Sequence, residues 1–145
     1  MRYTGGSIGR VFIVKIEHGD NLLDQLQNLA CQEELKAAVI FLLGAIKKAS
    51  IVAGPKECTV PPEQVWQEFE DGREILGIGT IFSNQDQPEL HIHATFGKGD
   101  ISLTGCVRKD AEVYLVVEAI VLELTGVAVN RQLDPELGLK MLTLH

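Results

Sequence analysis

The sequence predicts an α+β domain in which one main helix packs on a largely antiparallel sheet of six or seven strands. One early segment has apolar residues at helical spacing, and most of the remaining chain consists of β-branched apolar runs separated by turn residues. No stretch rich in Gly, Pro or Ser divides the 145 residues. We therefore expect a flexible N-terminal arm over residues 1–9 and a single domain over residues 10–145.

The first strand and the helix are expected between residues 10 and 35. Arg10 to Glu17 is rich in β-branched residues and partly alternates, which is typical of a strand. Asp20 follows in the turn and is the expected N-cap of a helix that runs to about Leu35. The apolar positions of this helix fall on one face: Leu22, Leu23, Leu26, Leu29 and Ala30.

The middle of the chain predicts two strands. Residues 37–53 are apolar and too long for a flat strand, so Gly44 indicates a bend or bulge within them. Residues 61–69 begin with two prolines and are polar, and we expect a loop there with about one helical turn. Residues 74–82 alternate in the way expected of a strand.

The second half predicts a hairpin followed by two further strands. Residues 90–96 and 101–107 flank Gly97-Lys98-Gly99-Asp100, which is a strong hairpin signal. Residues 112–124 form another long apolar run. Residues 130–144 are expected to return as a final strand.

A predicted zinc site lies on this hairpin. His91 and His93 stand at positions i and i+2 of a strand, so both imidazoles project from the same face. A turn centred between Lys98 and Gly99 places Cys106 opposite His91, and a slip of two residues keeps Cys106 on that face. Two imidazoles and a thiolate suit Zn²⁺, and three protein ligands leave a fourth position for water or a partner group.

Each of these three residues also has a simpler interpretation. His-x-His pairs are common on solvated strand faces, and a single cysteine such as Cys106 is often a small buried core residue. His18, in a turn, and His145, at the terminus, show no ligand spacing. The pattern alone leaves both interpretations open.

Glu118 is the candidate catalytic residue because it interrupts an otherwise apolar strand. An inward-facing carboxylate costs roughly several kcal/mol unless it finds a partner. It would then support a ligand histidine or act as a general base, a role for which Glu68 is a second candidate. If Glu118 faces outward, it belongs with Glu112 to a polar face.

Composition excludes several classes of protein. Hydrophobic residues make up 46% and charged residues 23% of the chain, which argues against disorder. The longest uncharged apolar run, residues 37–46, is about half of what a membrane span needs. The N-terminus lacks a signal peptide's apolar core, and three cysteines without a C-x-x-C pair fit a reducing cytoplasm. The net charge of −7 argues against general binding to a phosphate backbone.

Taken in order, several segments resemble the PPC (plants and prokaryotes conserved) domain family in its stand-alone prokaryotic form. The similar segments are RVFIVKIEHGDNLLDQL (10–26), FLLGA (41–45), GREILGIG (72–79), LHIHA (90–94), Gly105–Val107 with Glu118, and Arg131–Leu144. The resemblance covers nearly the whole chain and makes residues 10–145 a PPC-like domain.

The resemblance implies a homotrimer. Some prokaryotic members bind zinc through the His-x-His pair and the histidine of a Gly-Gly-His-Leu segment, which corresponds here to His91, His93 and Cys106. Cys106 is a departure, because Thr104–Val107 stands where the family has Gly-Gly-His-Leu. Members are often called DNA-binding by analogy, but this chain lacks the Arg-Gly-Arg-Pro segment of the plant AT-hook.

Three functions remain open. The first is a cytoplasmic, trimeric, zinc-binding assembly or regulatory module that contacts a protein partner. The second is a zinc-dependent enzyme that uses the open coordination position, with Glu118 or Glu68 as base. The third is a DNA-binding protein, whose affinity would fall sharply with salt.

Overall fold

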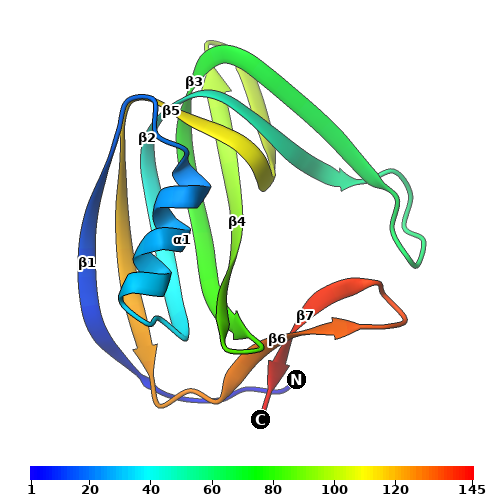
Figure 1. Cartoon of the computed structure of the whole chain (residues 1–145). Helices are drawn as coiled ribbons and strands as arrows, with labels where there is room; N and C mark the ends of the chain where they lie inside the picture. Colours follow the sequence, from blue (N-terminus) through cyan, green and yellow to red (C-terminus); the bar gives the residue numbers. More distant parts are fainter.

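The computed structural model describes residues 1–145 and contains one helix and seven strands (Figure 1). The strands are β1 (Ser7–Glu17), β2 (Ala37–Pro55), β3 (Gln64–Asn84), β4 (Gln87–Lys98), β5 (Ile101–Thr125), β6 (Val129–Asp134) and β7 (Leu139–Leu144). The helix α1 spans Leu22–Gln32. Five strands form an antiparallel sheet in the order β1-β5-β2-β3-β4, and β6 and β7 form a separate hairpin. The predicted α+β class is confirmed.

The sheet bends round because β5 is long enough to pair with three neighbours. Its first residues pair with β4, most of its length pairs with β2, and its last residues pair with β1. By returning to β4, β5 closes the sheet at this end. Phe69 and Phe96 fill the core there with their ring centroids 5.0 Å apart.

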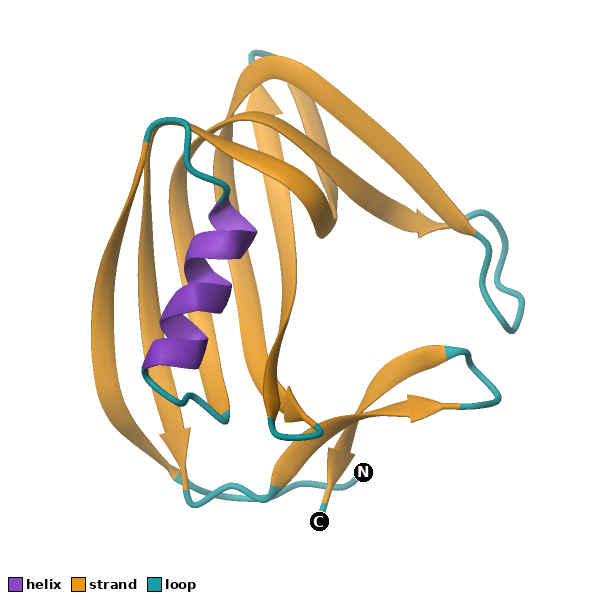
Figure 2. Cartoon of the chain, in the orientation of Figure 1, coloured by secondary structure: helices purple, strands orange, loops and turns teal.

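The helix α1 covers one face of the sheet (Figure 2). Its N-cap is Asn21 rather than the predicted Asp20: the Asn21 side chain accepts hydrogen bonds from the N–H groups of Leu23 and Asp24 at 3.0 and 3.2 Å. Asp20 instead accepts from the N–H of Glu17 at 3.1 Å. The buried residues of α1 are Leu22, Leu26 and Ala30. No helix of the structure has the length and apolar character needed to span a bilayer.

Several element boundaries differ from the sequence prediction. β1 begins at Ser7, so it includes the end of the predicted N-terminal arm. Residues 64–73 extend β3 instead of forming a helical turn, because they pair with the distal half of β2. The predicted strands at 101–107 and 112–124 are one strand, which continues through Asp110 at a φ of 56° and shifts register against β2. The last segment forms a two-stranded hairpin rather than one strand.

Gly44 lies at the bend expected in β2. Its φ is 140°, and a Cβ there would lie 2.8 Å from the Cα of Val117 in β5. The register between β2 and β5 shifts directly after Gly44. Glycine is therefore required for β5 to approach β2 at this point.

The sheet face opposite α1 is apolar and exposed. One row of paired residues crosses all five strands of the sheet: Ile13, Ile120, Phe41, Ile78 and His93. Ile13 is 76% exposed and Ile78 is 59% exposed. The neighbouring exposed apolar residues are Val11, Leu43 and Leu76. We call these residues the apolar face, and no helix or strand of the chain covers it.

Candidate metal centre

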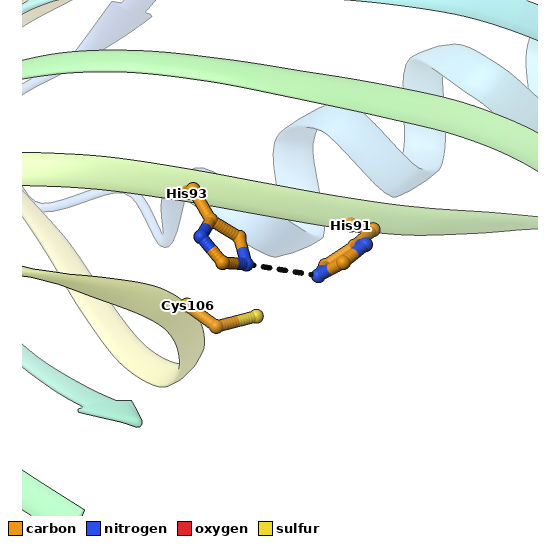
Figure 3. A group of neighbouring side chains, drawn as sticks. All are labelled: His91, His93 and Cys106. Carbon is orange, nitrogen blue, oxygen red and sulfur yellow. Dashed lines mark hydrogen bonds between the residues drawn. The ribbon is translucent and has the colours of Figure 1, made fainter. Parts of the chain in front are cut away.

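Three potential metal ligands converge where β4 meets β5. His91 and His93 project from the same side of β4, and Cys106 of β5 pairs directly with His93. The ligand atoms of the three residues all lie within 4.8 Å of one another. In Figure 3 the two rings lie side by side, and the sulfur of Cys106 points toward them. The structure thus brings together the three residues that the sequence singled out.

The pairing of the hairpin differs from the predicted one by two residues. Lys98 pairs with Ile101, so the turn is centred between Gly99 and Asp100 and Cys106 lies opposite His93 rather than His91. Because side chains alternate with a period of two, this slip leaves the cysteine on the predicted face.

The position of Cys106 is fixed on both sides by hydrogen-bonded strands. It pairs with His93 in β4 and with Val52 in β2. A Cβ on the preceding Gly105 would lie 2.5 Å from the carbonyl oxygen of Val52, so the close approach of the strands requires glycine. Cys106 is 5% exposed. The sulfur is therefore presented from a strand that is paired on both sides.

The ligand spacing fits a tetrahedral zinc ion. The Nε2 atoms of His91 and His93 are 3.1 Å apart. With Zn–N bonds of about 2.0–2.1 Å, tetrahedral geometry places two nitrogens roughly 3.3 Å apart. Tetrahedral Zn–S and Zn–N bonds place the sulfur roughly 3.5 Å from each nitrogen, and the sulfur here lies within 4.8 Å of both.

The three ligands differ in how readily they bind a cation. Burial, Arg131 and His93 lower the pKa of His91 from its ordinary value of 6.5 to about 4, so its imidazole is neutral at pH 7. Burial raises the pKa of the Cys106 thiol, an effect that Arg108 and Arg131 partly oppose. His91 therefore needs no net deprotonation to bind metal, whereas Cys106 must lose a proton.

We expect the metal-free protein to lose stability as the pH falls from about 6.5 to about 4. In this window an unfolded chain protonates His91 and the folded chain does not, so the unfolded state binds more protons. Above the window the contribution is constant. Denaturant unfolding in a chelating buffer at several pH values measures this slope, which His91→Gln should reduce. Equal slopes in the wild type and in His91→Gln would contradict the assignment.

Arg131 of β6 is the neighbour of the centre that sequence reasoning did not single out. Its Nη2 donates to Thr80 Oγ1 at 3.0 Å and lies 3.1 Å from Nδ1 of His91. The side chain is 8% exposed, and its buried Nε has no hydrogen-bond partner. In the sequence, the one signal is a single arginine in an expected strand, and its neighbours depend on how the β6–β7 hairpin folds back.

The carboxylates considered as bases lie elsewhere. Glu118 is exposed on the same sheet face as His93, but β2 and β3 lie between its segment of β5 and β4. Both residues line the same cavity of about 510 Å³ on the apolar face, with Phe41 and Ile78 between them in the sheet. Glu68 of β3 instead accepts a hydrogen bond from the Ser50 hydroxyl at 3.1 Å. Neither belongs to the group of converging ligands in one chain, and Glu118 has the outward orientation.

The two remaining histidines are also separate from the centre. His18 Nδ1 accepts a hydrogen bond from the N–H of Leu115 at 3.1 Å, and His145 Nε2 lies 3.1 Å from Asn130 Oδ1. Both interactions are local to other parts of the sheet and the C-terminal hairpin.

Solved structures share this fold over the whole chain. A metal-containing protein from Archaeoglobus fulgidus is 26% identical, with a TM-score of 0.86 and 99% of each chain covered. A plant- and prokaryote-conserved protein from Pyrococcus horikoshii is 24% identical, with a TM-score of 0.86 and coverage of 100% of this chain and 99% of that one. A protein from Ralstonia eutropha, named as a candidate DNA-binding protein, is 21% identical, with a TM-score of 0.75 and coverage of 92% and 90%.

No curated protein sequence matches the chain. The family model of the Plants and Prokaryotes Conserved (PCC) domain, the family abbreviated PPC above, matches residues 3–125. This match includes the helix, the five-stranded sheet and all three converging ligands. The chain therefore belongs to the Plants and Prokaryotes Conserved domain family.

Proposed function

We propose that this protein is a trimeric zinc-binding module with an assembly or regulatory role. The observation that carries the proposal is the convergence of His91, His93 and Cys106 within 4.8 Å where β4 and β5 pair. The similar protein from Archaeoglobus fulgidus is described as metal-containing, which supports metal binding by this chain.

Zinc is the metal that this donor set favours. Two neutral imidazoles and one thiolate are a borderline-soft set, and Zn²⁺ accepts them in tetrahedral geometry. A harder cation such as Mg²⁺ prefers oxygen ligands, and the converging group contains none. With three protein ligands, the fourth position of the zinc ion is free for water or for a group from a partner.

The apolar face supports assembly into a homotrimer. Contiguous exposed apolar surface on a small protein marks an interaction site, because leaving it in water is unfavourable. The row from Ile13 to His93 crosses every strand of the main sheet, and the same face carries Leu43 and Leu76. A closed ring of identical chains would bury this face in every copy.

The other two functions lack a comparable supporting observation. A zinc-dependent enzyme needs a base beside the metal-bound water; Glu118 lines the same cavity as His93, but neither Glu118 nor Glu68 belongs to the group that converges within 4.8 Å. DNA binding needs a basic surface, whereas the chain carries a net charge of −7. A cytoplasmic location is part of our proposal because three free cysteines fit a reducing compartment.

Metal content per chain tests the proposal directly. Protein purified without an affinity tag and without added metal is expected to contain about one zinc ion per chain by elemental mass spectrometry. Loading with Co²⁺ is expected to give the visible bands of a tetrahedral site and a thiolate charge-transfer band. Light scattering should give three times the chain mass of 15.9 kDa. Protein that binds no metal even when zinc is offered would contradict the zinc module.

A further inference from the structure

Arg131 is a buried cation placed beside a centre that is suited to bind another cation. Its side chain is 8% exposed and it forms no salt bridge, because the nearby Glu89 pairs with Lys140 at 2.7 Å instead. The guanidinium is held by Thr80 and His91 and lies over the Phe82 ring, 5.7 Å from its centroid, and its Nε has no hydrogen-bond partner. Glu89 attracts this cation without contacting it, so the buried charge is compensated only in part and is costly to keep there.

The contact between Arg131 and His91 sets the tautomer of the histidine. A guanidinium has only donors, so Nδ1 of His91 must accept the hydrogen bond from Nη2 at 3.1 Å. A neutral imidazole carries a single proton, which then lies on Nε2. Nε2 is the atom that faces His93, at 3.1 Å, and the sulfur of Cys106. In this state the nitrogen that would bind a metal carries a proton instead of a free lone pair.

Metal binding reverses these roles. When Nε2 of His91 holds the ion, the proton of the neutral ring lies on Nδ1, and metal-binding histidines normally donate it to an acceptor. Here that N–H would point at the N–H of the Arg131 guanidinium. Two donors cannot share a hydrogen bond, and the ion adds a further positive charge nearby.

We infer that Arg131 is an internal antagonist of the metal centre, so that metal binding breaks the Arg131–His91 contact and loosens the β6–β7 hairpin. The inference rests on the proposed zinc site and adds a form of regulation to it. Arg131 links β6 to β3 and β4, through Thr80 and His91, and Lys140 of β7 makes the ion pair with Glu89. Binding of metal would thus loosen a surface hairpin that itself provides no metal ligand.

The metal affinity of two Arg131 variants tests the antagonism. In Arg131→Gln the charge is gone and the amide oxygen can accept from Nδ1–H of His91, whereas Arg131→Met removes the charge without providing an acceptor. In competition with a chelator, zinc affinity should rise about tenfold to hundredfold in Arg131→Gln and less in Arg131→Met. The control, Arg108→Gln, removes an exposed charge near the same ligands and should change affinity by about twofold at physiological salt. Metal affinity that is unchanged or lower in both Arg131 variants would overturn the inference, because Arg131 would then be neutral or supportive.

Hydrogen exchange of the wild-type protein gives a readout that does not depend on a folded variant. Zinc should speed amide exchange over residues 129–144 and leave α1 unchanged. Slower or unchanged exchange in the hairpin would overturn the inference even if zinc binds at one ion per chain. If neither the wild type nor any variant binds zinc, the proposed function itself fails together with the inference.

Discussion

Replacing Cys106 by alanine is expected to reduce bound zinc from about one ion per chain to a small fraction of that. The thiolate is one of only three protein ligands, and its charge offsets part of the charge of the ion. Loss of an outer partner of a ligand typically costs 10–100-fold in metal affinity, so we expect loss of the ligand itself to cost more than about a hundredfold. Elemental mass spectrometry and chelator competition measure the two quantities.

Three matched variants test whether the loss of zinc is specific to the Cys106 thiolate. Cys31 and Cys58 are free and exposed, so Cys31→Ala and Cys58→Ala should keep the full zinc content. Cys106→His restores a three-histidine set, and it should retain zinc while the thiolate band of the cobalt form disappears. Full zinc content in Cys106→Ala would contradict the assignment of Cys106 as a ligand.

Replacing Ile78 by glutamate is expected to convert the trimer into monomers. Ile78 lies between Phe41 and His93 in the row that crosses the apolar face, and it is 59% exposed in the single chain. A carboxylate at this position would be buried without a partner in each of the three copies, at roughly several kcal/mol per copy. Light scattering reports the change as a fall in molar mass to that of one chain.

The control for this variant is Leu133→Glu on β6, where the leucine is 65% exposed and lies outside the apolar face. It should leave the molar mass unchanged. A wild-type monomer, or an Ile78→Glu variant that remains trimeric, would argue against the apolar face as the interface. Zinc content of the Ile78→Glu monomer then shows whether the ligands of one chain are sufficient.

The candidate site could be predicted because an error of two residues in strand register leaves each side chain on the same face of the sheet. The segment Gly97–Asp100 allows more than one turn centre, and the predicted centre lies one residue before the observed one. The pairing was therefore wrong by two residues. The face was still right, because a shift of two restores the same side of a strand. The convergence of His93 and Cys106 depends only on that parity.

Features that depend on long-range contacts could not be predicted in the same way. The polar residues around Asp110 look like a turn between two strands, and Asp110 does have a positive φ. Pairing with β2 nevertheless keeps residues 101–124 in one strand. In the strand at residues 64–73 only Phe69 is buried, so the sequence shows no apolar alternation there. The approach of Arg131 to His91 depends on where the last hairpin folds, which no local pattern encodes.

The pairing of β1 has a consequence for how the chain is made. β1 is an edge strand whose one neighbour in the sheet is β5, and Ser7 pairs with Thr125 near the other end of the chain. During synthesis, β1 therefore cannot pair until most of the chain, including β5, has been made. Pairings between residues so far apart in sequence slow folding. Until then its backbone groups and apolar residues are free to pair with other nascent chains. This protein is thus most exposed to aggregation before it leaves the ribosome, and a chain interrupted before β5 would have no partner for its first strand.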